Sequence, residues 1–328
     1  AAGRMTSQTT AGPDVAGAGT VRYAYDAESR LASWTGPEGD EHRYSYDAAG
    51  NATSLDGVPA TYDARNRLTS MGTDVAYEWN PNGTQAAVSR PESGTIDRRW
   101  DGLGRLIGDG VATYTYDGLG RVAAAGAQQF SYAGDLPEPA KIGDTPLTRS
   151  PGGTEPLASG ADRLSSDLTG HITARIGADG QVLQSRRYAP FGEQIAEGDV
   201  GPVGFQGQYT TDTGLTWMQA RWYDATTHTF LSRDPYTALP PDQHNLFQYA
   251  TSDPVNFSDP TGTRISYSKT SWWRRAASRA KSWIGSRIFP KKRAVRRHVA
   301  VDDCWGSCGR SSKKIIRGAT ARVYRSKA

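Results

Sequence analysis

The sequence has few of the features that stabilise a small domain covalently or anchor it in a membrane. Its 328 residues include only two cysteines, Cys304 and Cys308, so no disulfide framework can support the residues before them. No run approaches the roughly 20 apolar residues of a membrane-spanning helix. The start at Ala1 also lacks the charged and then apolar pattern of a secretion signal. We therefore expect the sequence to be a cut piece and any export signal to lie elsewhere.

Apolar residues are scarce as well, at 37% of the chain, whereas glycine and tyrosine are common, with 37 Gly and 16 Tyr. A composition of this kind is typical of many short elements joined by turns. It argues against a single compact globule as the first expectation.

Charge is distributed unevenly along the chain. Residues 264–328 carry 19 Lys and Arg against only Asp302 and Asp303, an excess of 17 positive charges. Because the whole chain sums to +4, residues 1–263 sum to −13. Two segments of opposite sign indicate two roles, and the basic one suits phosphates, anionic lipid or an acidic container.

An internal repeat occupies the first half of the chain. An aromatic residue followed by Asp or Asn recurs six times, at steps of 21, 16, 17, 21 and 16 residues. The pairs are Tyr25-Asp26, Tyr46-Asp47, Tyr62-Asp63, Trp79-Asn80, Trp100-Asp101 and Tyr116-Asp117. In most copies a glycine follows the Asp or Asn three residues later, as in Asp101 to Gly104. Asp or Asn first and Gly last is typical of a tight turn.

The residues before each turn alternate with period two, as in Tyr44-Ser45-Tyr46 and Tyr114-Thr115-Tyr116, which predicts strands entering hairpins. A step of 16 to 21 residues holds two short strands and two turns. One such unit cannot bury its apolar face alone, so we expect successive hairpins to add edge to edge into one long sheet. An unrelated β-sandwich is disfavoured because it needs no periodic aromatic-acidic pair.

These pairs resemble the YD repeats of the RHS family, which includes bacterial polymorphic toxins, wall-associated repeat proteins, the C components of insecticidal toxin complexes and the teneurins. Further stretches resemble the RHS repeat-associated core domain in order and spacing, so that the resemblance covers about residues 20–262. They include Arg187-Tyr188-Ala189-Pro190-Phe191-Gly192-Glu193, Phe205-Gln206-Gly207-Gln208, Ala220-Arg221-Trp222-Tyr223-Asp224, Phe230-Leu231-Ser232-Arg233-Asp234-Pro235, Asn245-Leu246-Phe247-Gln248-Tyr249 and Asp253-Pro254-Val255-Asn256.

The resemblance implies a mainly β protein: a ribbon of hairpins that spirals as part of a shell, a core domain that plugs it, and a variable C-terminal segment held inside. We expect the piece to be an open ribbon plus the plug, with the rest of the shell upstream. The expected divisions are an N-terminal linker at 1–20, YD repeats at 21–165, the core domain at 166–263 and a basic tail at 264–328. The resemblance also implies a secreted or cell-surface location, and neither a cofactor nor a metal is expected.

In many RHS proteins the core domain looks like an aspartyl protease that cuts its own chain after an Asp-Pro-x-Gly-Leu element. The matching residues here are Asp259-Pro260-Thr261-Gly262, so the cleavage site falls between Gly262 and Thr263, where Thr263 replaces the usual apolar residue. The chemistry needs two carboxylates close enough for one to keep a proton while the other activates water.

We take Asp234 and Asp259 as the catalytic pair, with Asp253 as a substitute for either and Arg233 as the stabilising cation. The same Asp-Pro and Asp-x-x-Gly sequences are also ordinary turn formers, as expected in a tightly folded plug. Both interpretations stay open at this point.

The basic tail predicts a short helix over residues 271–289, with Ser271 as N-cap and Pro290 after its end. Tryptophans and aliphatic residues fall on one side and basic residues on the other. Such a helix suits an anionic membrane surface, the basic residues equally suit nucleic-acid phosphates, and a third interpretation is a cation neutralised by the acidic scaffold. The binding candidates are Arg274, Arg275, Lys291, Lys292, Arg293, Arg296 and Arg297.

Cys304, Cys308 and His298 do not match the spacing of a zinc motif, so a small disulfide loop or two free thiols is expected. His298 near Asp302 and Asp303 is a weaker candidate for a nuclease acid-base pair.

Two functions fit this sequence. The first is the scaffold of a polymorphic toxin in interbacterial competition, which holds a basic effector, releases it by autoproteolysis and has an immunity protein as a partner. The second is a non-enzymatic cell-surface or wall-associated repeat protein that binds glycans or protein partners through its Tyr- and Trp-rich strands.

Overall fold

The computed structural model describes residues 3–11, 16–150, 155–196, 198–236 and 245–267. The chain separates into two units, Ala1–Arg274 and Arg275–Ala328, and every described residue belongs to the first. The predicted basic helix at 271–289, the basic residues from Arg274 to Arg297 and the cysteines lie outside the described residues. No helix among the described residues has the length and apolar character needed to cross a membrane.

The described residues are almost entirely antiparallel strands, which confirms the predicted β class. The first ten form one sheet in sequence order: β1 (Ser7–Thr10), β2 (Gly19–Tyr25), β3 (Leu31–Thr35), β4 (Glu41–Tyr46), β5 (Ala52–Leu55), β6 (Val58–Tyr62), β7 (Leu68–Met71), β8 (Val75–Trp79), β9 (Gln85–Arg90) and β10 (Gly94–Asp97). A two-stranded sheet of β11 (Arg99–Trp100) and β12 (Leu106–Gly108) follows.

A nine-stranded sheet continues the ribbon, again in sequence order: β13 (Tyr114–Tyr116), β14 (Val122–Ala125), β15 (Gln128–Tyr132), β16 (Pro139–Ile142), β17 (Thr145–Arg149), β18 (Pro156–Ser159), β19 (Asp162–Ser166), β20 (Ile172–Ile176) and β21 (Val182–Ser185). Because neighbours in the sheets are neighbours in the sequence, the ribbon is made of consecutive hairpins, as the repeat predicts.

The expectation of one long sheet was wrong in one respect, because the pairing is interrupted around β11 and β12. Pairing of β10 with β9 ends at Asp97. The Arg98 guanidinium then donates to the Gln85 side chain at 2.7 Å, and the Trp100 indole donates to the Gln85 carbonyl at 2.7 Å. One backbone bond remains here, from the Arg98 amide to the Ala86 carbonyl at 2.8 Å, and these side-chain bonds add to it.

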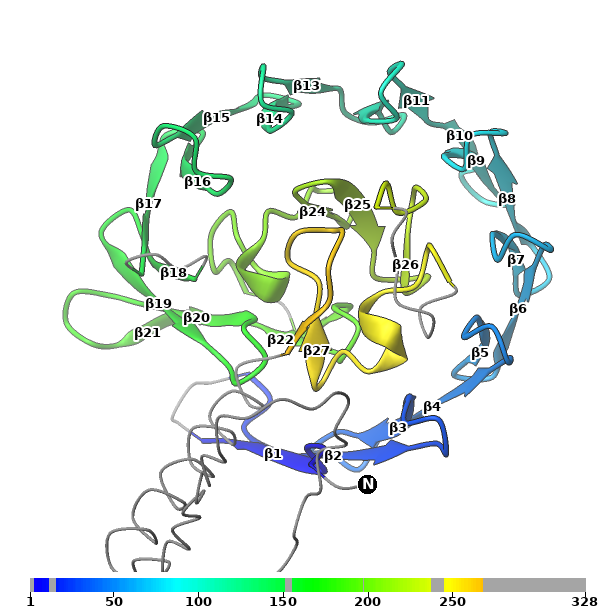
Figure 1. The fold of residues 1–328 in the computed structure, drawn as a ribbon. Helices are drawn as coiled ribbons and strands as arrows, with labels where there is room; N and C mark the ends of the chain where they lie inside the picture. The colour runs from blue at the N-terminus through cyan, green and yellow to red at the C-terminus, as the bar shows by residue number, and fades with distance from the viewer. Residues whose placement is uncertain (1–2, 12–15, 151–154, 197, 237–244, 268–328) are drawn as a thin grey trace, which may run out of the picture. The chain divides into compact units, whose positions relative to one another are not determined.

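The core region after β21 contains shorter elements. They are β22 (Arg187–Tyr188), β23 (Gln194–Ala196), the 3-10 helix η1 (Phe205–Gly207), β24 (Leu215–Met218), β25 (Arg221–Asp224), β26 (Thr229–Phe230), the 3-10 helix η2 (Ala250–Ser252), β27 (Phe257–Ser258) and β28 (Ser266–Tyr267). Within this first unit, Figure 1 shows the ribbon following a curved path around these elements.

The ribbon extends beyond the expected limits at both ends. Residues 7–10, expected in a linker, form β1 and pair with β2. At the other end, strand pairing continues past residue 166 to β21, because Asp167 forms the same kind of turn as the earlier repeats, accepting the His171 amide at 3.0 Å.

The two ends of the ribbon also contact each other, whereas an open ribbon was expected. The Ala16 amide donates to the Ser185 hydroxyl at 2.8 Å. The Arg187 guanidinium lies 3.1 Å from the Glu38 carboxylate. Side-chain contacts therefore connect the start and the end of the ribbon, although β1 and β21 do not pair.

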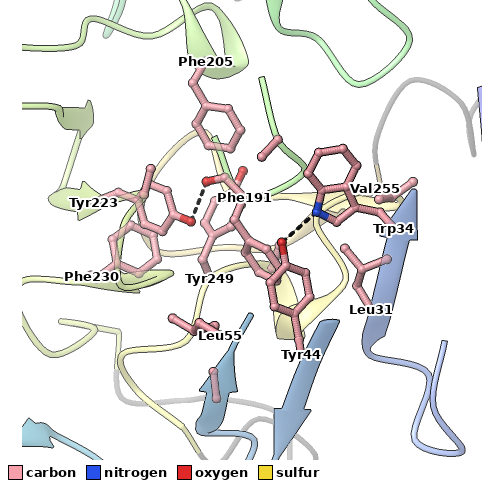
Figure 2. Close-up of a cluster of buried hydrophobic side chains, with 14 of the residues drawn as sticks. Leu31, Trp34, Tyr44, Leu55, Phe191, Phe205, Tyr223, Phe230, Tyr249 and Val255 are labelled. Atoms are coloured by element: carbon pink, nitrogen blue, oxygen red, sulfur yellow. Dashed lines mark hydrogen bonds between the residues drawn. The ribbon is translucent and has the colours of Figure 1, made fainter. Parts of the chain in front are cut away.

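Apolar side chains from the inner side of the ribbon pack against the core region. Figure 2 shows one such cluster, in which Leu31, Trp34 and Tyr44 of the ribbon lie with Phe191 and Tyr249 of the core. A second cluster joins ribbon residues to Trp217, Trp222 and Leu231, and its ribbon members include Leu106, Tyr114, Val122, Phe130, Ile142 and Leu147. Burial of these faces is the main stabilising contribution that a single hairpin could not obtain alone.

The aromatic-acidic pairs have two distinct structural roles. The Asp closes its own turn: the Asp117 Oδ1 atom accepts the amides of Leu119 at 2.9 Å and Arg121 at 3.0 Å, and Oδ2 accepts the Arg121 guanidinium at 2.7 Å. This is an Asx-type turn strengthened by an ion pair.

The aromatic residue connects its repeat to the preceding one. Its hydroxyl or indole N–H donates to the backbone carbonyl of the residue six positions after the previous aromatic, at 2.7–3.1 Å. The pairs are Tyr46 to Leu31, Tyr62 to Ala52, Trp79 to Leu68, Trp100 to Gln85, Tyr116 to Leu106 and Tyr132 to Val122. We call this repeated bond the aromatic staple.

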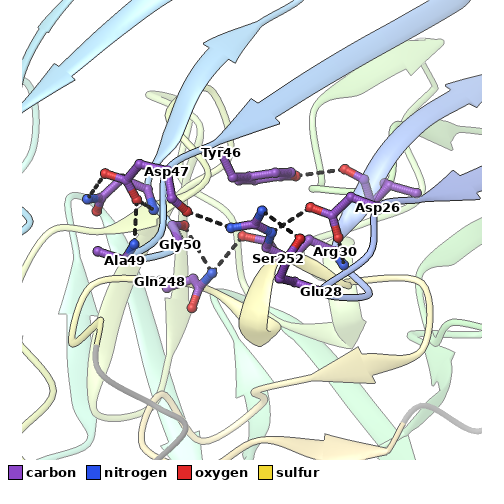
Figure 3. A network of polar contacts seen from close by, with 11 residues as sticks. Asp26, Glu28, Arg30, Tyr46, Asp47, Ala49, Gly50, Gln248 and Ser252 are labelled. Atoms are coloured by element: carbon purple, nitrogen blue, oxygen red, sulfur yellow. Dashed lines mark hydrogen bonds and ion pairs between the residues drawn. The ribbon is translucent and has the colours of Figure 1, made fainter.

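Basic residues reinforce the staple. As Figure 3 shows, the Arg30 guanidinium donates to the Asp47 carbonyl at 2.7 Å, and it lies 4.8 Å from the centre of the Tyr46 ring. Arg105 lies over Tyr116 at 4.7 Å in the same way. A turn carbonyl and an aromatic face are thus both contacted by the neighbouring repeat.

Candidate functional site

A buried arginine lies at the centre of the core region. Arg221 begins β25, in which all four residues are buried, and the whole residue is only 4% exposed. A cation without solvent needs anionic partners within the protein. Those partners are Asp234, which follows β26, and Asp259, which follows β27.

The two carboxylates share one nitrogen of the arginine. The Arg221 Nη2 atom lies 3.0 Å from Asp234 Oδ2 and 3.2 Å from Asp259 Oδ2. Because both oxygens contact the same nitrogen atom, the two carboxylates lie near each other. The structure brings together the two aspartates that the sequence pairs as a catalytic dyad, although 25 residues separate them in the chain.

Arg221 and Asp259 also contact the peptide bond between Gly262 and Thr263. Arg221 Nε donates to the Gly262 carbonyl oxygen. On the other side of the bond, the Thr263 amide donates to Asp259 Oδ1 at 3.1 Å, and the Arg264 amide donates to the same oxygen at 2.9 Å. A cation thus faces the carbonyl oxygen and a carboxylate faces the amide nitrogen of one peptide bond.

The local sequence explains this placement. Asp259, Pro260 and Gly262 form a turn in which the Gly262 amide donates to the Asp259 carbonyl at 3.2 Å. Gly262 has φ of +65°, and a Cβ atom at this position would overlap the Met218 carbonyl oxygen. Only glycine fits here, because the backbone is left-handed and lies against another strand end.

Burial changes the acidity of the site. Burial raises the pKa of Asp234 above its ordinary value; the Arg221 charge opposes this shift, and the Asp259 charge adds to it. Burial also lowers the pKa of Arg221, against the opposing charges of Asp234 and Asp259.

The structure corrects the predicted cation. Arg221, and not Arg233, lies against the two carboxylates. Arg233 is exposed, and its backbone amide donates to the Gly83 carbonyl at 3.0 Å. Adjacent residues of an extended segment point to opposite sides, so an inward Asp234 requires an outward Arg233.

Asp253 is not brought into this group. It is 1% exposed, lies 3.1 Å from the Arg4 guanidinium and accepts the Asn256 side-chain amide at 2.8 Å. Burial raises the pKa of Asp253, and the Asn256 and Arg4 bonds oppose this shift. Its contacts are those of a residue that joins the start of the ribbon to the core.

A cavity of about 420 Å³ lies beside Thr263, on the C-terminal side of this peptide bond. Its lining includes Arg221, Thr261 and Thr263 of the core together with several aromatic and basic side chains. The lining also contains Trp100, Arg105, Tyr116, Arg121, Trp217 and Trp222. Water therefore has room beside Thr263, whereas Gly262 is buried.

The described residues contain no group of three or more His, Cys, Asp or Glu side chains placed to hold a metal ion.

Comparison with known proteins gives similarity to one family over the ribbon. A family model described as Teneurin YD-shell matches residues 2–133. Human teneurin-1 (Homo sapiens) is 26% identical over 279 residues, covering 71% of this chain and 10% of the teneurin. Teneurin-1 of Mus musculus is 31% identical over 108 residues, covering 26% of this chain and 4% of the relative. The chain thus spans about a tenth or less of the length of these relatives.

Two solved structures resemble the chain at low sequence identity. TcdB2-TccC3 without its hypervariable C-terminal region has a TM-score of 0.47 and 17% identity, covering 74% of this chain and 15% of that one. TcdB2-TccC3-Cdc42 has a TM-score of 0.49 and 19% identity, with the same coverage of 74% and 15%.

The YD-shell match covers the ribbon from β1 to β15, whose hairpins are joined by aromatic-acidic turns, and the teneurin similarity continues beyond it. These similarities support an RHS/YD-repeat shell scaffold.

Proposed function

We propose that this shell scaffold carries a C-terminal effector and releases it by hydrolysing its own peptide bond between Gly262 and Thr263. The observation that carries the proposal is the pair of contacts on that bond: Arg221 Nε on the Gly262 carbonyl oxygen and Asp259 Oδ1 on the Thr263 amide at 3.1 Å. A turn that served only to fold the plug would not need a buried cation and two buried acids around one peptide bond.

The reaction begins with water from the cavity. Ionised Asp259 removes a proton from the water, and the resulting hydroxide attacks the Gly262 carbonyl carbon. The negative charge that develops on the carbonyl oxygen is stabilised by Arg221, which already donates to that oxygen. Asp234 holds Arg221 in place at 3.0 Å.

The intermediate then collapses with cleavage of the carbon–nitrogen bond. Asp259 returns its proton to the Thr263 nitrogen, which lies against its Oδ1 atom. The products are a carboxylate on Gly262 and a free amine on Thr263. The departing segment starts at Thr263 and contains the basic residues of the tail.

The proposed cargo and scaffold differ in charge, which supports an effector held by its container. Residues 264–328 carry an excess of 17 positive charges, and residues 1–263 sum to −13. Attraction between the two would retain the tail until it is released. We further propose a secreted or cell-surface location, a role in interbacterial competition and an immunity protein as partner. The proposed target of the tail is an anionic membrane or a nucleic acid.

The alternative function, a non-enzymatic surface protein that binds glycans or protein partners, requires no cleavage. It is distinguished by the state of the chain after purification.

The test is electrophoresis and intact-mass analysis of the purified chain beside three variants. We expect the wild type to separate into residues 1–262 and 263–328, and Asp259→Asn and Asp234→Asn to remain whole. Asp253→Asn is the matched control: it is another buried aspartate before a proline, but it lies against Arg4 and not Arg221. Cleavage in Asp253→Asn with none in the other two supports the proposal. A folded wild type that stays whole, or cleavage that survives Asp259→Asn, overturns it.

A further inference from the structure

A buried carboxylate of the ribbon contacts the core close to the proposed cleavage site. Glu138 lies directly before β16 and is only 7% exposed. Its Oε1 atom accepts the Gln219 side-chain amide at 2.7 Å, and its Oε2 atom lies 3.7 Å from the Arg149 guanidinium. A carboxylate with so little solvent needs such partners, because burying an unpaired charge is costly. Glu138 is therefore paired with Arg149 of the ribbon and bonded to Gln219 of the core.

Gln219 occupies the tight turn that joins β24 to β25. Met218 of β24 pairs with Arg221 of β25. Gln219 and Ala220 are therefore the whole connection. The φ angle of Gln219 is +53°, in the left-handed region that favours glycine. The glutamine side chain makes the bond to the ribbon, which a glycine at this position could not make.

The same turn lies against the residues around the scissile bond. The Met218 carbonyl oxygen is the atom that a Cβ at Gly262 would overlap. The Ala220 amide donates to the Thr261 carbonyl at 3.2 Å. The next residue, Arg221, donates through Nε to the Gly262 carbonyl oxygen. A shift of this turn would therefore move the arginine away from the carbonyl group that it contacts.

We propose that Glu138 is a positioning residue for the cut between Gly262 and Thr263. Its bond to Gln219 fixes the turn and thereby the start of β25, where Arg221 lies. Cutting then depends on the packing of the ribbon against the core, because the ribbon supplies the acceptor. This inference rests on the self-cleavage proposed above. A displacement of about 1 Å can slow a reaction by roughly a hundredfold, so we expect loss of this bond to slow cutting by about tenfold or more.

The other end of β24 provides a matched control. The Thr213 hydroxyl, shortly before β24, donates to Asp109 Oδ2 at 2.8 Å. Asp109 is also a buried ribbon carboxylate, 2% exposed, and lies between β12 and β13. Each end of β24 thus has a bond from the core to a ribbon carboxylate. Only the Gln219 end leads directly into Arg221, because the Thr213 end lies beside the far end of β25.

The test follows cutting of the full chain with time during cell-free synthesis, by electrophoresis, at a temperature below the unfolding transition of each variant. Gln219→Met and Thr213→Val each remove one donor to a ribbon carboxylate and keep a side chain of similar size. We expect Gln219→Met to slow cutting by about tenfold or more and Thr213→Val to cut at nearly the wild-type rate. Equal slowing in both variants, or an unchanged rate in Gln219→Met, overturns the proposal.

Two variants at Glu138 test the ribbon side. Glu138→Gln keeps an amide group that can bond Gln219, whereas Glu138→Met keeps the size of the side chain without such a group. We expect the first to cut at nearly the wild-type rate and the second as slowly as Gln219→Met. A role in stability alone would lower the Tm without separating the cutting rates of the two folded variants. The Gln219 and Thr213 variants decide the case if Glu138→Met does not fold.

Failure of this inference is distinct from failure of the proposed function. A wild type that cuts, with Glu138→Gln and Glu138→Met cutting at equal rates, overturns the role of Glu138 alone. A folded wild type that stays whole overturns the self-cleavage and this role together.

Discussion

Removing a single hydroxyl from the aromatic staple tests how the repeats are joined. In Tyr46→Phe the ring remains under the Arg30 guanidinium, at 4.8 Å, but the 2.8 Å bond to the Leu31 carbonyl is lost. Leu31 is fully buried at 0% exposure, so its carbonyl has poor access to water as a replacement donor. A buried acceptor left without a partner costs about 1–3 kcal/mol.

We expect Tyr46→Phe to lower the free energy of unfolding by about 1–2 kcal/mol, which corresponds to a fall of roughly 2–8 °C in Tm for a chain of this size. The assay is urea unfolding followed by circular dichroism, in which the midpoint should fall without a change in slope. Tyr236→Phe is the control, because Tyr236 is 57% exposed and its loss should stay within about 0.5 kcal/mol. Equal shifts in the two variants would refute the staple as a stabilising bond.

Three further predictions concern the site and the turns. Thr263→Leu places an apolar side chain at the edge of the 420 Å³ cavity. It should raise the free energy of unfolding, measured with urea, by about 1 kcal/mol. A decrease would show that the cavity cannot accept the leucine side chain. Gly262→Ala forces a Cβ atom against the Met218 carbonyl oxygen in a backbone with φ of +65°. It should lower the free energy of unfolding by about 2 kcal/mol or more, which is seen as a lower Tm. An unchanged Tm would contradict this steric overlap. Burial alone would raise the pKa of Asp101, but bonds from the Arg105 amide and guanidinium lower it below the ordinary 3.8. The ionised Asp101 therefore stabilises the folded protein fully above pH 3.8, and this contribution is lost as the pH falls through the lower pKa of the folded state. Urea midpoints at pH 7 and pH 3 should therefore differ less in Asp101→Asn than in the wild type, and an equal difference would contradict this contribution.

The ribbon follows from local rules and was predictable to a large extent. Period-two strands and Asp-to-Gly turns act within a few residues, so the hairpins and their sequential pairing can be deduced from spacing alone. The staple was harder to foresee, because it joins different repeats. Its signal is present in the sequence: the aromatic of one repeat bonds the residue six positions after the previous aromatic, as Tyr116 bonds Leu106.

The site was predicted only in part, for a physical reason. Asp234 and Asp259 could be named from a resemblance, but their cation depends on which side chains the fold turns inward. Arg233 is next to Asp234 in sequence and therefore points away from it, whereas Arg221 arrives from a different strand. A single arginine in the apolar run from Leu215 to Tyr223 was the available signal, since a buried cation requires buried acids.

The most direct test of the account is intact-mass analysis of the chain purified in water enriched in oxygen-18. Hydrolysis by activated water predicts two fragments, one beginning with a free amine on Thr263 and one ending at Gly262 with a heavy oxygen atom in its new carboxylate. A folded chain that keeps its full-length mass, or a cut at any other bond, contradicts the assignment of Arg221 and Asp259 to this reaction.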